Sequence, residues 1–436
     1  MNAASPGYAA RRARLAAAMQ AGAVAIIPTA PEAVRNGDSE YPYRHDSYFY
    51  YLTGFDEPEA LLVLAQGKSI LFCRPRDAAR EIWDGMRHGP EGARAAFGFD
   101  EAFPVEELDA RMPDLLADAS SLYYASGHDV RLDARLAGWI GAVRQRARSG
   151  VTAPESVHNV RVLLDDMRVI KDEAEQALMR RAALVSSRAH ERAMRATRPG
   201  MHEYEIEAEL LYEFRRNGAQ FPAYTPIVAS GPNACILHYN QNRRQVADGD
   251  LVLIDAGCEL DGYASDITRT YPAGGRFSAP QQALYELVLA AQAAAMQEAR
   301  PGRPYSAMHD AAVQVLAQGM ADLKLVPQSN AADVIAERAH LQFYMHGTGH
   351  WLGMDVHDTG SYRDLDAPGR PSRTLVPGMA LTVEPGIYVR PTPGVPEQYW
   401  NIGIRIEDDV LVTAGACTVL SDAPKLVADI EHLMQK

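Results

Sequence analysis

The chain has 436 residues, of which 47% are hydrophobic and 23% charged, and its formal net charge is −13. This length is sufficient for two domains, each with a hydrophobic core of its own. The acidic excess argues against nucleic acid as a main partner, because a phosphate-binding surface needs clustered lysine and arginine.

The sequence predicts neither a membrane span nor a leader segment. Its apolar runs are shorter than the roughly 18 residues of a transmembrane helix, and residues 1–8 lack a charged segment followed by an apolar core. The cysteines Cys73, Cys235, Cys258 and Cys417 are scattered without CxxC spacing, which is typical of buried thiols in a reducing compartment. We therefore expect a cytoplasmic protein without membrane partners.

The first part of the chain has the pattern of an α/β domain, in which apolar strand-like runs alternate with helical stretches. Strands are expected at residues 21–28, 60–65, 69–73 and 122–125. The segment 168–182 then has acids early and arginines late, which is typical of a new helix. We place the domain boundary here and predict domains of residues 1–167 and 168–436.

The second domain is predicted to alternate helices with antiparallel strands, which is an α+β architecture. Helices are expected at residues 172–197, 202–217, 280–299 and 304–323. Several of the predicted strands end in acidic residues.

Two of these acids are expected on neighbouring strands. Asp255 ends a short apolar run, and Asp266 follows a tight turn. If Leu260 and Asp261 form the loop, antiparallel pairing places Asp255 opposite Asp266, with Cβ atoms about 4.5–5.5 Å apart. Leu-Asp is not a favoured hairpin dipeptide, so the register depends on that assumption.

A second pair follows the same logic. Glu384 ends the run 380–384, and alternation in residues 401–407 places Arg405 and Glu407 on one strand face, opposite three isoleucines. A single acid at a strand end usually caps a turn or pairs with a cation. Four buried carboxylates, however, need partners or metals to neutralise them. Two such strand pairs can enclose two ions roughly 3.5–4 Å apart.

A histidine-rich segment supplies a fifth ligand. His346 and His350 are four residues apart, but the glycines between them argue against a regular helix and favour a loop that approaches a ligand. A lone histidine is usually structural, whereas three within twelve positions, including His357, favour a site. One imidazole with four carboxylates favours manganese or cobalt, with zinc as an alternative. The predicted ligands are Asp255, Asp266, His350, Glu384 and Glu407.

Ordered motifs around these residues resemble aminopeptidase P, the Xaa-Pro aminopeptidase family. They are IVASGPNACILHY (227–239), DLVLIDAGCE (250–259), GYASDITRT (262–270), HGTGHWLGMDVHD (346–358), LTVEPGIY (381–388) and GIRIEDD (403–409). Residues 38–60 also resemble the N-terminal domain of that family. The resemblance therefore covers nearly the whole chain.

The resemblance implies a ribonuclease H-like, creatinase-type N-terminal domain followed by a catalytic domain of pita-bread fold. It implies two divalent metal ions per subunit, most readily manganese. Asp255 would bind one ion through both oxygens, Asp266 and Glu407 would bridge the two, and His350 and Glu384 would complete the second. Glu384 would also carry protons while a water or hydroxide between the ions attacks the scissile carbonyl.

Further residues take substrate roles by the same resemblance. His346 would contact the substrate near the metals, and His238 and His357 would stabilise the tetrahedral intermediate or hold the proline side. Arg405 would orient ligands or substrate, and Tyr388 is a further pocket candidate. The predicted substrate-binding residues are therefore His238, His346, His357, Tyr388 and Arg405. The predicted catalytic residues are Glu384, His238, His346, His357 and Arg405.

The implied activity is release of the first residue from peptides with proline second. A bond to proline lacks the amide N–H that many peptidases use, so its cleavage needs a dedicated enzyme. The closest alternative is a prolidase, which has the same five ligands but accepts only Xaa-Pro dipeptides. A metal-free relative such as creatinase, or a binding protein on this fold, is disfavoured because all five ligands are retained.

The N-terminal domain is expected to limit access to the site and to mediate assembly into a homo-oligomer, either a dimer or a tetramer. Trp83 would then contribute to a neighbouring subunit's pocket. Alternatively, Trp83 packs in its own domain's core or interface. The loop 362–373 departs from the family pattern, so the resemblance assigns no gating arginine there.

Overall fold

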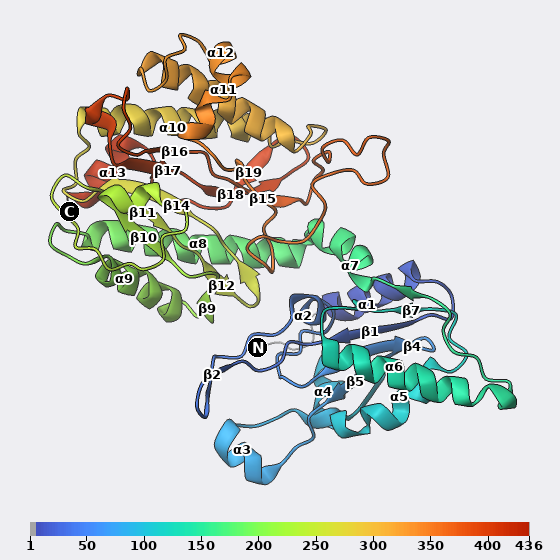
Figure 1. Cartoon of the computed structure of the whole chain (residues 1–436). Coiled ribbons are helices and arrows are strands. Elements are labelled where there is room, and N and C mark those ends of the chain that lie inside the picture. Colours follow the sequence, from blue (N-terminus) through green and yellow to red (C-terminus); the bar gives the residue numbers. More distant parts are fainter. Residues whose placement is uncertain (1–5, 436) are drawn as a thin grey trace. The chain divides into compact units, whose positions relative to one another are not determined.

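The computed structural model describes residues 6–435; residues 1–5, part of the segment considered above for a leader, and residue 436 lie outside that range. The chain separates into two compact units, Met1–Met167 and Arg168–Lys436, here called the N-terminal and C-terminal units (Figure 1). Within residues 6–435, no helix is both long enough and apolar enough to cross a membrane. All four cysteines are free thiols, three of them buried and Cys417 half-buried.

The N-terminal unit is built on one mixed sheet with the strand order β6-β5-β4-β1-β7-β8. Its strands are β1 (Val24–Pro28), β4 (Leu61–Ala65), β5 (Lys68–Cys73), β6 (Glu101–Pro104), β7 (Leu122–Tyr123) and β8 (Val157–His158), with a separate hairpin of β2 (Val34–Asn36) and β3 (Ser39–Glu40). Its helices are α1 (Pro6–Ala18), α2 (Ser47–Thr53), α3 (Ala78–Asp84), α4 (Gly89–Phe97), α5 (Leu108–Leu116) and α6 (Val130–Gln145). All four predicted strands are present, as β1, β4, β5 and β7, and the α/β prediction is confirmed.

Helix α3 and the residues just after it carry an apolar surface that their own unit does not cover. Ile82, Trp83 and Met86 are 82%, 83% and 81% exposed, which is unusual for three large apolar side chains so close in sequence. The alternative that Trp83 packs in the core of its own domain is therefore wrong.

The C-terminal unit contains the four predicted helices, α8 (Glu173–Ala196), α9 (Glu203–Arg216), α10 (Ala279–Glu298) and α11 (Ser306–Asp322). Helix α7 (Val160–Val169) crosses the boundary between the two units and precedes α8. The shorter α12 (Ala331–Ala336) and α13 (Val427–Met434) follow α11. A capping box fixes the start of α8, because Asp172 accepts from the Glu175 N–H and Glu175 accepts from the Asp172 N–H. Helices and antiparallel strands together confirm the α+β prediction for this unit.

Short antiparallel strands lie between the α8–α9 pair and the α10–α11 pair (Figure 1). The first group is β9 (Phe221–Pro222), β10 (Ile227–Ser230), β11 (Leu251–Asp255), β12 (Cys258–Leu260), β13 (Tyr263–Ala264) and β14 (Thr268–Pro272). The second is β15 (Ala380–Val383), β16 (Gly386–Val389), β17 (Ile402–Arg405), β18 (Asp408–Val412) and β19 (Cys417–Val419). The regular strands break at or beside Asp255, Asp266, Glu384 and Glu407.

The predicted register of the first acidic pair is wrong. Asp255 pairs with Thr268 on β14 and not with Asp266. The hairpin loop is Asp261–Gly262, whose φ angles of 50° and 79° are both positive. Asp-Gly adopts that turn far more readily than Leu-Asp, so the turn chemistry moves the pairing by two residues.

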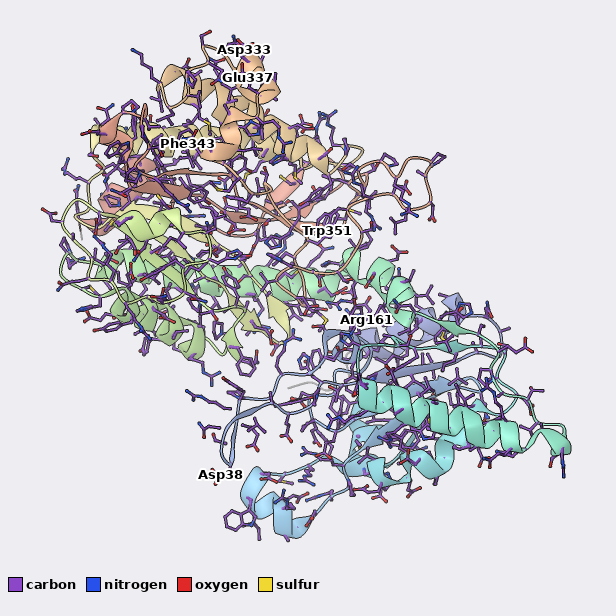
Figure 2. The ribbon with its side chains drawn as sticks, viewed as in Figure 1. Asp38, Arg161, Asp333, Glu337, Phe343 and Trp351 are labelled. Atoms are coloured by element: carbon purple, nitrogen blue, oxygen red, sulfur yellow. The ribbon has the colours of Figure 1, made fainter. Side chains whose placement is uncertain are left out.

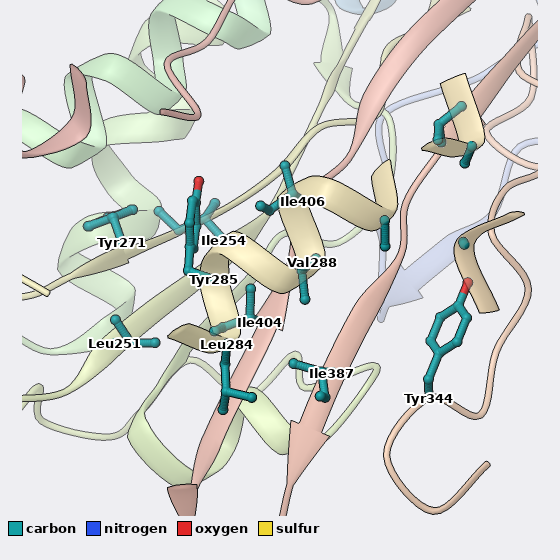
Figure 3. Packing of buried hydrophobic residues seen from close by; sticks show 14 of the residues in the cluster. Leu251, Ile254, Tyr271, Leu284, Tyr285, Val288, Tyr344, Ile387, Ile404 and Ile406 are labelled. Carbon is teal, nitrogen blue, oxygen red and sulfur yellow. The ribbon is translucent and has the colours of Figure 1, made fainter. Parts of the chain in front are cut away.

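The second predicted strand pattern is confirmed. Ile404 and Ile406 are fully buried and belong to the same apolar core as Leu284 and Val288 of α10 (Figure 3). Arg405 and Glu407 instead line the cavity described below. Other large buried residues of this unit, such as Phe343 and Trp351, are labelled in Figure 2.

Candidate metal centre

The five predicted ligands converge on one cavity of about 310 Å³ in the C-terminal unit. Strand ends supply Asp255, Glu384 and Glu407, a break before β14 supplies Asp266, and a loop supplies His350. The remaining lining residues are Leu237, His238, His346, Gly347, Gly349, His357 and Arg405. Residues from both strand groups thus meet in one place, although they are far apart in the sequence.

The distances suit a shared cation. Ligand atoms of Asp266, His350 and Glu407 all lie within 4.8 Å of one another, and all three residues are buried. His350 Nε2 lies 3.3 Å from Asp266 Oδ2 and 3.8 Å from Glu384 Oε1. Asp255 joins the group through Tyr224, whose hydroxyl lies 2.6 Å from Asp255 Oδ1 and 2.5 Å from Asp266 Oδ1.

The loop that carries His350 runs beside β15. Thr382 N donates to His350 O at 2.9 Å, and Glu384 N donates to Thr348 O at 2.7 Å. A Cβ on Gly349 would lie 2.0 Å from Thr382 O, so this close approach requires glycine. Residues 346–350 form a loop and not a regular helix, as predicted, and the approach of this loop to a ligand stays a prediction.

His350 is oriented for coordination. Its Nδ1 lies 2.9 Å from Trp351 O, which accepts a hydrogen bond when that nitrogen carries the proton. This arrangement leaves Nε2 facing the acids with a lone pair for a metal ion, as is usual for metal-binding histidines.

The carboxylates carry more negative charge than their neighbours balance. Burial, with the charges of the other acids, raises the pKa of Glu407 well above its usual value and that of Glu384 to about 7. Burial also raises the pKa of Asp255, although Arg405 opposes the shift. Burial alone would raise the pKa of Asp266, but the neighbouring His350 outweighs it, so the pKa of Asp266 is lowered. Burial alone would lower the pKa of His350, but Asp266 outweighs it and the pKa rises to about 9.

This donor set fits two divalent cations. Four carboxylates and one imidazole face the cavity, and Arg405 is the one arginine or lysine among the lining residues. Oxygen-rich sites of this kind suit hard divalent ions, whose charge would also offset the repulsion among the buried acids.

Arg405 connects the two acidic pairs. Its Nη2 donates to Asp255 Oδ2 at 2.6 Å, and its Nε donates to Thr268 Oγ1 at 3.1 Å. Thr268 in turn donates to Glu407 Oε2 at 2.7 Å. One guanidinium group thus orients carboxylates from both strand groups.

His346 is held by a second set of contacts. Its Nε2 lies 2.8 Å from the Tyr388 hydroxyl, which also accepts from Arg405 Nη1 at 2.9 Å. Burial, followed by the charge of Arg405, lowers the pKa of His346 to about 3, so the ring is neutral near pH 7. Tyr388 is only 1% exposed and lies behind His346 and Arg405. A direct contact between Tyr388 and substrate stays a prediction.

His238 and His357 form part of the wall between this cavity and a neighbouring one of about 370 Å³. The ring of His357 lies 4.1 Å from that of His350, measured between centroids. Burial lowers the pKa of His357. The second cavity is also lined by Tyr224, Thr225, Ile227, Asn240 and Val356.

Sequence reasoning missed three supporting residues. Thr268 lies two positions after Asp266, and strand alternation could have revealed it. Asp409 accepts from the Asp266 N–H at 3.1 Å, and its place beside Glu407 was a weaker signal. Tyr224 precedes β10 in an irregular segment, where no spacing pattern indicates its position.

Comparisons with known proteins agree with this geometry. Residues 177–414 match the model of metallopeptidase family M24, and residues 8–123 match that of the aminopeptidase P N-terminal domain. The Xaa-Pro aminopeptidase of Escherichia coli K12 is 43% identical over 97% of this chain and 96% of its own length. That of Haemophilus influenzae is 44% identical over the same shares.

Solved structures show the same likeness. The aminopeptidase PepP of Pseudomonas aeruginosa is 50% identical, with a TM-score of 0.97 over 100% of this chain and 99% of its own. Zinc-substituted E. coli aminopeptidase P in complex with product is 43% identical, with a TM-score of 0.95 over 99% and 98% of the two chains. The expected two-domain, pita-bread architecture is thereby confirmed. This chain belongs to the aminopeptidase P group of metallopeptidase family M24.

Proposed function

We propose that this protein releases the N-terminal residue from peptides with proline at the second position. The convergence of Asp255, Asp266, His350, Glu384 and Glu407 on one cavity carries the proposal. Support also comes from relatives named Xaa-Pro aminopeptidase, which match over 97% of the chain.

In this proposal two divalent ions occupy the cavity. Asp255, Asp266 and Glu407 would hold one of them, and Asp266, Glu407, His350 and Glu384 would hold the other. Such ions polarise the scissile carbonyl and lower the pKa of water toward neutrality. Manganese or cobalt suits the oxygen-rich donors, and zinc stays an alternative because a zinc-substituted form of the E. coli relative exists.

Glu384 moves the proton. Its carboxylate lines the cavity beside the other four predicted ligands, where it would accept a proton from the attacking water and return it. The leaving nitrogen of proline carries no hydrogen in the peptide and must gain one as the C–N bond breaks.

Three histidines and Arg405 hold the substrate. His346 would contact the substrate beside the predicted metals, and His238 and His357 would face the reacting carbonyl or the proline ring. Arg405 orients Asp255 and the substrate at the same time. Tyr388 supports this set from behind.

We also propose a cytoplasmic homo-oligomer, either dimeric or tetrameric, in which domain 1–167 restricts access to domain 168–436. The free thiols support the location. The exposed Ile82 and Trp83 of α3, with Met86 just after it, support assembly through this surface, with Trp83 entering a neighbouring subunit's pocket. Replacing Trp83 with leucine should raise KM for peptides, and unchanged kinetics would remove the pocket role.

The test uses metal-stripped protein reloaded with manganese. It is incubated with an Xaa-Pro-Xaa tripeptide and the corresponding Xaa-Pro dipeptide, and products are identified by mass. Manganese-dependent release of the first residue from the tripeptide is expected. Cleavage of the dipeptide alone would identify a prolidase, and cleavage of neither would indicate a binding protein.

A further inference from the structure

The strand pairing is interrupted where Glu384 and Glu407 lie. Strand β15 pairs with β18 and β16 pairs with β17, but residues 384–385 and 406–407 belong to neither ladder. Pro385 has no N–H to donate. Both carboxylates line the cavity, and a single backbone hydrogen bond, from Ile406 N to Pro385 O at 3.3 Å, crosses the break between them.

One side chain of α10 spans this interruption. Gln292 Nε2 lies 3.2 Å from Val383 O and 3.1 Å from Ile406 O, the carbonyls directly before Glu384 and Glu407. It also lies 3.1 Å from Asp408 Oδ2. An amide nitrogen has two hydrogens, so at least one of them is shared between two acceptors.

Gln292 is itself held in place by charged residues. Its Oε1 accepts from Lys425 Nζ at 3.0 Å, and Lys425 also pairs with Asp408 Oδ2 at 2.5 Å. Arg269 donates to Asp408 Oδ1 and to the carbonyl of Glu407, both at 2.6 Å. The peptide groups on both sides of Glu407 are therefore hydrogen-bonded by this buried network, in which Gln292 is only 1% exposed.

We propose that Gln292 is a positioning residue that sets the spacing of Glu384 and Glu407 and so the affinity for metal. The direction of each Cα–Cβ bond follows from the orientation of its peptide groups, and Gln292 bonds the preceding peptide group of both residues. Partners behind metal ligands commonly change metal affinity 10- to 100-fold. This inference rests on the proposed metallopeptidase function.

Glutamine suits this position because its amide donates on one side and accepts on the other. Leucine would fill a similar volume but leave the carbonyls without that donor and Lys425 without that acceptor. Asparagine keeps both groups on a side chain one methylene shorter, so it cannot reach both strands equally well.

The test compares Gln292→Leu and Gln292→Asn with Val288→Ala, a change to a buried core residue one turn earlier on α10 (Figure 3). Manganese affinity of each metal-stripped protein is measured by calorimetry, with the melting temperature as a second readout. Both Gln292 variants should bind manganese about 10-fold more weakly. Val288→Ala should lower the melting temperature and keep wild-type affinity.

Wild-type affinity in both Gln292 variants would overturn the positioning role and leave the metallopeptidase proposal intact. Equal loss of affinity in Val288→Ala would also overturn it, because general destabilisation would then explain the effect. A wild-type protein that binds no manganese would instead contradict the proposed function and this inference together.

Discussion

Glu407 and Asp408 are adjacent in the chain and equally buried, yet their pKa values move in opposite directions. Burial and three nearby acids raise the pKa of Glu407 well above its usual range. For Asp408 burial acts in the same sense, but Arg269 and Lys425 outweigh it and lower its pKa to about 2. Glu407 faces the cavity, whereas Asp408 faces the network around α10.

The difference separates a buried acid that has cationic partners within the protein from one that lies mainly among other acids. Asp408 has two cationic partners within the protein, and Asp358 likewise contacts both Arg168 and Lys171. The cavity instead gathers four acids around Arg405 and His350. Because uncompensated buried charge is unfavourable, the protein leaves a place there for cations of external origin.

Glu407→Gln should have the largest effect on activity. It removes a predicted bridging ligand, so kcat/KM on an Xaa-Pro-Xaa tripeptide should fall at least about 1,000-fold. Because the raised pKa favours the neutral form of Glu407 in the metal-free protein, a neutral glutamine should leave the melting temperature equal or raise it. Retained activity, or an unfolded variant, would contradict this account of Glu407.

Asp408→Asn should affect stability far more than Glu407→Gln. Arg269 and Lys425 would lose their counter-charge, which should reduce the free energy of unfolding by about 3–5 kcal/mol. Urea denaturation of both metal-free variants measures the contrast. Equal free energies of unfolding of the two variants would show that the charge balance around Asp408 does not contribute to stability.

Manganese affinity should increase with pH. Glu384 and His350 have pKa values of about 7 and 9, and that of Glu407 lies well above its usual range. The metal-free site therefore holds protons at pH 6, which a metal must displace, and fewer as the pH rises. Between pH 6 and 8 the Kd should fall about 10-fold per pH unit for each displaced proton.

Calorimetry in buffers of different ionisation enthalpy counts the released protons directly. Affinity that does not change with pH, with no proton release, would mean that the carboxylates are not the ligands.

Tyr224→Phe should have a smaller effect. The change removes the hydroxyl between Asp255 and Asp266 but keeps the ring, so the fold should be unaffected. Manganese affinity should fall about 10-fold, in the range usual for partners of metal ligands. Unchanged affinity would limit Tyr224 to a structural or substrate-side role.

The sequence was sufficient to predict which five residues meet in the cavity, because they lie at strand ends, in the break before β14 or in a glycine-rich loop, within motifs of a known family. The pairing partner of Asp255 could not be inferred by placing Asp255 opposite Asp266, because the turn at Asp261–Gly262 sets the register and pairs Asp255 with Thr268. Gln292 could not be predicted, since it lies 91 and 114 residues from the carbonyls it contacts. Contacts of this kind depend on how elements distant in the sequence pack together, and local sequence patterns do not show that packing.

Metal stoichiometry tests the central claim most directly. The stripped protein is titrated with manganese and weighed intact by native mass spectrometry, beside Glu407→Gln as a control. Two ions per wild-type chain, and fewer in the variant, are predicted. A wild-type chain that binds no manganese, or binds the same number of ions as the variant, would contradict the view that the excess acids form a two-metal site.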